Sequence, residues 1–288
     1  MTRVKHSGRT ALGKPERESY AALMRDRIAK LRTGVTLPYT EQGRADGTPV
    51  VLLHAWGESR HAFSRVCPLI PDTLRVLAPD QRGHRDASKP PTGYTLADYV
   101  ADVEAFLDAV GVASAVIAGS SSGGYVGQQF ALDHPDRTRG LVLIGAPLSL
   151  HGRAPFADEV EGLVDPIDRD WVRASLSWFR LQRAVPQEYL EDRVEDGVRM
   201  PARVWRDALA GLSEAVPPTE AGVIGVPALV IWGGRDELLP ADTGERLTAA
   251  IPGAVLRTYE DGGHLVLWEH PDRVARDITE FARSLSPN

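Results

Sequence analysis

Three consecutive serines stand between glycines in the segment Gly119-Ser-Ser-Ser-Gly-Gly124. The segment follows an apolar run over residues 115–118 and precedes a helical pattern that begins at Tyr125. A G-x-S-x-G pattern between a strand and a helix is typical of a nucleophile elbow, a tight turn that holds a serine in a strained conformation with its hydroxyl exposed. Only Ser121 has glycine both two residues before and two residues after it. We therefore predict that Ser121 is a nucleophile.

A serine hydroxyl attacks poorly unless a base takes its proton and a third group orients that base. His264 lies in the glycine-rich loop Asp261-Gly-Gly-His264, after a late strand, where an imidazole can project over a sheet. We predict that His264 is the base. The acid candidates are the neighbours Asp236 and Glu237, which follow the apolar run over residues 228–232. The rival bases, none of them in such a loop, are His134, His151 and His270.

Acyl transfer also requires two fixed N–H donors for the negative charge that develops on the carbonyl oxygen. The first predicted donor is the backbone N–H of Ser122, because it follows the nucleophile directly. The second predicted donor is the backbone N–H of Trp56, in the loop after the apolar run over residues 50–53. The indole of Trp56 is also expected to form part of a pocket wall.

These residues need a scaffold that brings distant loops to one edge of a sheet. Short runs rich in Val, Leu, Ile and Ala alternate with helical patterns, including predicted helices over residues 95–110 and 271–285. Because both faces of such unbroken apolar strands must be covered, they indicate an α/β fold with a mostly parallel sheet flanked by helices. The predicted strands are Val35–Tyr39, Val50–His54, Arg75–Ala78, Ala115–Gly119, Leu141–Ile144, Ala228–Trp232 and Ala254–Thr258.

One long segment breaks this alternation. Residues 148–224 show helical periodicity without a strand pattern, and they hold three of the six tryptophans. We predict a helical cap there, inserted between the two core segments 34–147 and 225–288 and placed over the carboxyl ends of the strands. The tryptophans concerned are Trp171, Trp178 and Trp205.

The N-terminal segment differs from the rest of the chain in charge. Residues 1–33 carry a net charge of +6, and the remainder carries −12. We predict that this segment is a basic extension, and that its residues 15–32 form a short charged helix. The helical prediction rests on apolar residues at spacings of four, four and three. These residues are Tyr20, Met24, Ile28 and Leu31.

The composition limits the function classes. A chain of 288 residues that is 43% apolar, with a net charge of −6, is typical of a soluble globular protein and argues against nucleic acid as the main partner. No apolar run approaches the roughly 18 residues that span a bilayer. The N-terminal residues lack the apolar stretch of a secretory signal, and the single Cys67 cannot form an internal disulfide. We expect a cytoplasmic protein without a metal or other cofactor.

Five stretches together resemble the α/β-hydrolase fold family, from about residue 35 to residue 285. The resemblance implies an eight-stranded, mostly parallel sheet and a Ser–His–Asp triad that works without a cofactor. It also favours Asp236 over Glu237 as the acid. The stretches are Val51-Leu-Leu-His-Ala-Trp-Gly57, Arg75-Val-Leu-Ala-Pro-Asp-Gln-Arg-Gly-His84, the turn at Ser121, Ile231-Trp-Gly-Gly-Arg-Asp236, and Gly263-His264 with Trp268-Glu-His-Pro271.

Together, the residues and the resemblance predict a serine hydrolase of a carboxylic ester or lactone. The apolar and aromatic content of the predicted cap indicates an apolar, aromatic or macrocyclic substrate, and similar proteins include lactonases of zearalenone-type resorcylic lactones. The alternatives are C–C bond hydrolysis or perhydrolysis on the same triad, and a small-ligand receptor of the same fold with little turnover. The basic extension is a candidate contact for a homo-oligomer.

Overall fold

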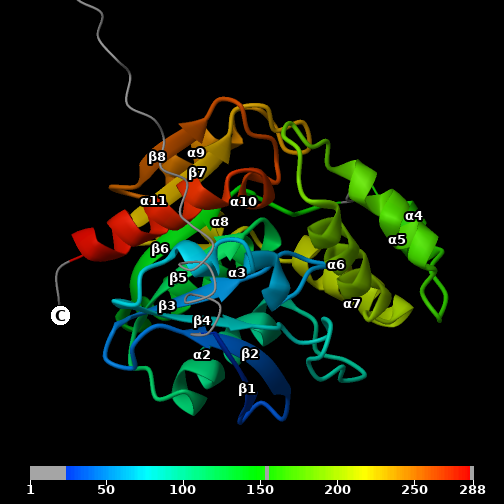
Figure 1. Cartoon of the computed structure of the whole chain (residues 1–288), viewed down its shortest axis with the longest axis horizontal. Coiled ribbons are helices and arrows are strands. Elements are labelled where there is room, and N and C mark those ends of the chain that lie inside the picture. The colour runs from blue at the N-terminus through cyan, green and yellow to red at the C-terminus, as the bar shows by residue number, and fades with distance from the viewer. Residues whose placement is uncertain (1–23, 153–155, 286–288) are drawn as a thin grey trace, which may run out of the picture.

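The computed structural model describes residues 24–152 and 156–285, which build an eight-stranded sheet (Figure 1). The strand order from edge to edge is β1-β2-β4-β3-β5-β6-β7-β8. The β1–β2 and β2–β4 pairs are antiparallel, and the other neighbours are parallel. The strands are β1 Arg25–Lys30, β2 Thr36–Gln42, β3 Thr48–Leu53, β4 Leu74–Pro79, β5 Ala115–Ser120, β6 Thr138–Ile144, β7 Ala228–Gly233 and β8 Val255–Tyr259.

The seven predicted strands are confirmed as β2 to β8, with bounds that shift by no more than three residues. The two helices predicted from apolar stripes are confirmed as α2 (Leu96–Ala109) and α11 (Pro271–Ser284). Thr95 caps the first of them: its side chain accepts from the N–H of Asp98, whose carboxylate accepts from the N–H of Thr95 in return.

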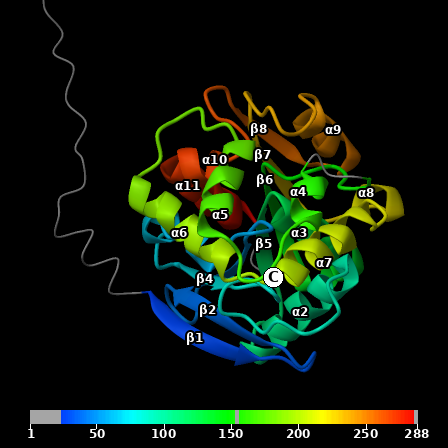
Figure 2. The same cartoon turned by 90° about the vertical axis from the view of Figure 1, so that its right-hand side faces the viewer.

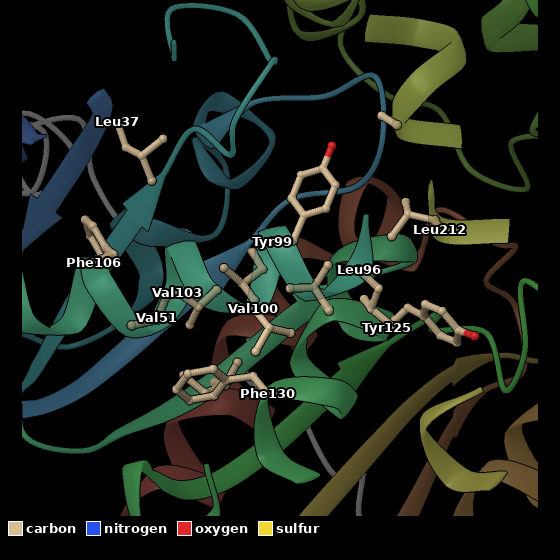
Figure 3. Packing of buried hydrophobic residues seen from close by; sticks show 14 of the residues in the cluster. Leu37, Val51, Leu96, Tyr99, Val100, Val103, Phe106, Tyr125, Phe130 and Leu212 are labelled. Atoms are coloured by element: carbon tan, nitrogen blue, oxygen red, sulfur yellow. The ribbon is translucent and has the colours of Figure 1, made fainter. Parts of the chain in front are cut away.

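Side chains of the central strands alternate between two buried layers, as the period of a strand requires. Val51 of β3 packs against α2 and α3 in one layer (Figure 3), whereas its neighbour Leu52 packs against α10 and α11 in the other. Helices therefore cover both faces of the parallel strands, and all side chains of β5 and β7 are buried. Of the helices in these layers, α3 spans Ser122–Asp133 and α10 spans Val266–Glu269, and α9 (Thr243–Ala250) connects β7 to β8.

The long connection between β6 and β7 is helical, and its described part contains no strand. Figures 1 and 2 show α4 to α7 gathered beside one end of the sheet. We call the set below the inserted helices. They are α4 (Ala157–Glu161), α5 (Arg169–Ser175), α6 (Gln187–Val198), α7 (Ala202–Ser213) and α8 (Pro218–Ala221), with a short 3-10 turn over Leu176–Trp178.

The helix predicted over residues 15–32 is wrong where the structure describes it, because Arg25–Lys30 is the edge strand β1. β1 pairs with β2 through its backbone and buries only Ala29, so its side chains show no alternating apolar pattern. Ile28, taken as part of an apolar helical stripe, is 67% exposed. The rest of that prediction, and most of the proposed oligomer contact, falls in residues 1–23, outside the described residues.

None of the helices within residues 24–152 and 156–285 is long and apolar enough to cross a bilayer.

Candidate active site

The turn at Ser121 joins β5 to α3 and has the geometry of a nucleophile elbow. The backbone of Ser121 is strained, with φ 47° and ψ −119°. A Cβ at Gly119 would lie 2.3 Å from the carbonyl oxygen of Gly123, and one at Gly123 would lie 2.3 Å from that of Leu53. These two positions therefore require glycine, because the colliding atoms belong to the backbone.

This steric requirement can be measured. Gly123→Ala is expected to lower the free energy of unfolding by about 3 kcal/mol, because a backbone carbonyl cannot turn away from the new methyl group. The measurement is urea unfolding followed by tryptophan fluorescence. Gly127→Ala, one turn later in α3, is the matched control: its Cβ would meet only side-chain methyl groups of Leu141 and Ile117, at 3.2 and 3.3 Å. An equal loss in both variants would contradict the steric argument.

The structure brings the three predicted triad residues together from three loops. The Oγ of Ser121 lies 3.0 Å from Nε2 of His264, and Nδ1 of His264 lies 2.9 Å from Oδ2 of Asp236. A carboxylate can only accept, so Nδ1 carries the proton and Nε2 accepts from the serine hydroxyl. The other oxygen of Asp236 accepts from the backbone N–H groups of Leu238 and Leu239, which fix the carboxylate.

The side chains of His264 and Asp236 are almost fully buried, with exposed fractions of 3% and 1%. The ring of Phe179 stacks on the imidazole of His264, with 5.7 Å between centroids. Contacts from two sides therefore hold the imidazole in line between the hydroxyl and the carboxylate.

The rival residues lie in other environments. Glu237 pairs with Arg180 at the surface, and Nδ1 of His270 accepts from Arg183. His134 stacks on the ring of Phe130. His151 lines the pocket beside Ser121, but the imidazole that contacts the Ser121 hydroxyl belongs to His264. The single thiol is no competing nucleophile either, because burial raises the pKa of Cys67 to about 12.

The two predicted oxyanion donors lie side by side, but one of them is occupied. Ser122 is the first residue of α3, so its N–H has no partner within the helix. The N–H of Trp56 donates to the hydroxyl oxygen of Ser122 at 2.7 Å. In this structure the predicted donor at Trp56 therefore already has an acceptor, the side chain of Ser122. No pattern in the sequence indicates this contact.

A cavity of about 250 Å³, here called the main cavity, opens beside Ser121. The rings of Trp56 and Phe156 stack in it at 5.4 Å, and those of Phe156 and Trp178 at 4.5 Å. Residues that follow strands β3, β5, β6 and β7 line it together with residues of α5, α6 and α7, so these three helices lie over the carboxyl ends of the strands. Its aromatic lining is Trp56, Phe156, Trp178, Phe179, Trp205 and Trp268.

A second cavity of about 790 Å³, here called the outer groove, adjoins His264 but is not lined by Ser121. Leu176, Trp178 and Leu238 border both spaces. The imidazole thus stands between two compartments that can hold different halves of one molecule.

Two charged residues of the main cavity were missed from the sequence, Glu58 and Arg193. Glu58 stands two residues after Trp56, so the predicted loop itself was a signal that it lies near the site. Arg193 and Asp196 are three residues apart on a helix and look like an ordinary surface ion pair, whereas both are buried. No cluster of three or more His, Cys, Asp or Glu that could hold a metal was found in the described ranges.

Comparisons with known proteins agree with this architecture. The chain matches the α/β hydrolase fold family over residues 48–213 and 188–271. It is 30% identical to a pimeloyl-[acyl-carrier protein] methyl ester esterase of Neisseria meningitidis, over 82% of this chain and 94% of that protein. It is 28% identical to a non-heme chloroperoxidase of Streptomyces lividans, over 87% and 97%. A hydrolase structure from Pseudomonas aeruginosa superposes with a TM-score of 0.79 at 30% identity, over 89% and 97%. The chain therefore belongs to the α/β-hydrolase fold family.

Proposed function

We propose that this chain is a serine hydrolase that cleaves carboxylic esters, lactones included, through a covalent acyl-enzyme. The observation that carries the proposal is the relay from Ser121 through His264 to Asp236, at a strained turn that opens into an apolar cavity. The relative named as a methyl ester esterase supports ester chemistry.

Each step of the proposed hydrolysis can be assigned to a particular atom of the site. Oγ of Ser121 attacks the ester carbonyl carbon while Nε2 of His264 takes the hydroxyl proton. Asp236 stabilises the resulting imidazolium, and the N–H groups of Trp56 and Ser122 hold the oxyanion. The tetrahedral intermediate collapses, and Nε2 returns the proton to the leaving alkoxide. Water, deprotonated by the same nitrogen, then attacks the acyl-enzyme and releases the acid.

The leaving group must lie on the side of His264, because Nε2 gives it a proton. We therefore assign the alcohol half to the outer groove and the acyl half to the main cavity. In a lactone the two halves belong to one ring, and the ring bridges the two spaces. The inserted helices then act as a cap, and their aromatic rings favour an apolar substrate that is aromatic or macrocyclic, such as a zearalenone-type resorcylic lactone.

The contact between Trp56 and Ser122 makes a separate prediction. The hydroxyl of Ser122 must turn away before the N–H of Trp56 can hold an oxyanion. This rotation requires the net free energy of one hydrogen bond. Ser122→Ala removes the competing acceptor, so kcat/KM is expected to rise about 2- to 10-fold. Ser122→Thr keeps a hydroxyl and is the control, expected at or below the wild-type value. A loss of activity in the alanine variant alone would show that the hydroxyl donates to the oxyanion instead.

The proposed function is tested on a panel that contains an aryl ester, an alkyl ester, zearalenone and a vinylogous 1,5-diketone. We expect multiple turnovers per protein on at least one ester or on the lactone. Release of a single equivalent of product would favour a receptor, and cleavage of the diketone alone would favour C–C bond hydrolysis. Either of these results would contradict the proposal.

A further inference from the structure

The guanidinium of Arg193 is an unusual lining group for an apolar cavity. Its side chain projects from α6 with an exposed fraction of 1%, and its Nε donates to Oδ2 of Asp196 at 2.8 Å. The central carbon of the guanidinium lies over the ring of Tyr189, 4.6 Å from the centroid. The two terminal nitrogens, Nη1 and Nη2, form no hydrogen bond of regular geometry within the described residues, and the side chain of Tyr189 is the polar group nearest to them. Up to four buried N–H donors of a residue that lines the cavity therefore lack an acceptor in regular geometry.

A carboxylate lines the same cavity. Oε2 of Glu58 accepts from the N–H of Ala55 at 3.1 Å, and Oε1 accepts from the indole N–H of Trp268 at 3.0 Å. Burial raises the pKa of the Glu58 carboxyl, an effect that the positive charge of Arg193 opposes. Within the described residues, no ion pair joins Glu58 to Arg193 directly. Each carboxylate oxygen still has a lone pair for a second donor.

The charges of this region decide which ligand fits. Asp196 accepts from two guanidinium groups, because Arg85 also contacts its other oxygen. Arg85 and Arg193 are therefore balanced by Asp196 and Glu58, and an additional anion would stand beside the Glu58 carboxylate. A hydroxyl group has no charge and can both accept from Arg193 and donate to Glu58. A hydroxyl group can therefore accept from the buried N–H groups of Arg193 without placing a second negative charge beside Glu58.

We propose that Arg193 and Glu58 form a subsite for a hydroxyl group on the acyl half of the substrate. The assignment to the acyl half rests on the proposed function, because both residues line the main cavity and neither lines the outer groove. The subsite narrows the substrate class from apolar esters to hydroxylated ones, and the aromatic walls around it suit a phenol.

The test compares three 4-nitrophenyl esters that differ only in the para substituent of a 3-phenylpropanoyl group: hydrogen, hydroxyl or carboxylate. We expect the wild-type kcat/KM for the hydroxyl ester to exceed that for each of the other two by about 10- to 100-fold, as for a hydrogen bond to a charged group. Equal values for the hydrogen and hydroxyl esters would overturn the subsite. A preference for the carboxylate ester would overturn its assignment to a hydroxyl.

Three variants separate recognition from folding. Arg193→Met removes the donors and is expected to bring the ratio of the hydroxyl to the hydrogen ester towards one. Arg193→Lys keeps a cation for Asp196 but loses the planar pair of terminal nitrogens, so the ratio is expected to fall although the fold is retained. Arg85→Gln is the matched control, because Arg85 contacts the same Asp196 but does not line the main cavity. An unchanged ratio in Arg193→Lys, or an equal fall in Arg85→Gln, would contradict the proposal.

A binding measurement distinguishes failure of the subsite from failure of the proposed function. Ser121→Ala protein is titrated with the same three esters, and the fluorescence of the cavity tryptophans reports the dissociation constants. Tighter binding of the hydroxyl ester by about 10-fold, lost in the double variant with Arg193→Lys, would support the subsite even if the wild type hydrolysed none of the esters. Equal binding of all three would overturn the subsite even if the wild type hydrolysed them all.

Discussion

Replacing Ser121 by alanine is expected to lower kcat on the best ester of the panel by about 10⁴- to 10⁶-fold, with little change in KM. The Ser121 hydroxyl is the group that Nε2 of His264 contacts, at 3.0 Å, and Ser121 lines the main cavity. Without it no acyl-enzyme forms, and His264 has no proton to take. The measurement is steady-state release of 4-nitrophenol at matched protein concentrations.

The chain contains its own control, because Ser120 stands next to the proposed nucleophile. Ser120 is the last residue of β5 and is buried, so Ser120→Ala removes a hydroxyl at nearly the same place and is expected to keep activity within about threefold. A serine-directed phosphonate should label the wild type and Ser120→Ala but not Ser121→Ala, as intact mass would show. Equal labelling of Ser121→Ala would place the nucleophile elsewhere in the chain.

The part of the fold that the sequence predicts well is the buried part. β5 and β7 are covered on both faces, so packing demands unbroken apolar runs, and these runs are visible in the chain. β1 gave no such signal because it is an edge strand stabilised by backbone pairing with β2. The charged residues of β1, and the helical spacing of Ile28 and Leu31, favoured a helix. The segment is a strand because its backbone pairs with β2, a contact that the sequence pattern does not show.

Within the site, residues defined by their immediate neighbours in the chain could be predicted, whereas residues defined by contacts between distant segments could not. The elbow is local: two glycines within a tight turn leave one serine in the right frame, so Ser121 could be found without a structure. The acid could not be chosen from spacing, because Asp236 and Glu237 are neighbours, and only the resemblance favoured Asp236. Arg193 could not be found either, since its burial depends on the packing of α6 against the loop after β3. Ser59 of that loop donates to Asp196 of α6, a contact between segments far apart in the chain.

The second large effect is expected at Asp236. Asp236→Asn should lower kcat by about 10⁴-fold while the free energy of unfolding changes little. The Oδ1 atom accepts from two backbone N–H groups, so the asparagine oxygen is expected to remain there and turn its NH₂ towards Nδ1 of His264. Nδ1 would then have to accept, and the ring proton would move to Nε2. An imidazole with its proton on Nε2 cannot take the proton of Ser121, although every heavy atom keeps its place.

Glu237→Gln is the matched control for this prediction, because it removes one carboxylate charge a single residue away. Glu237 pairs with Arg180 at the surface, and exposed pairs contribute about 1 kcal/mol or less. Its kcat is therefore expected to stay within about twofold of the wild type. If the two variants lost activity equally, the long-range charge rather than the tautomer would be responsible. If Asp236→Asn alone lost activity but kept its phosphonate labelling rate, the role of Asp236 would lie after the attack by Ser121, in deacylation, and the tautomer argument would be wrong.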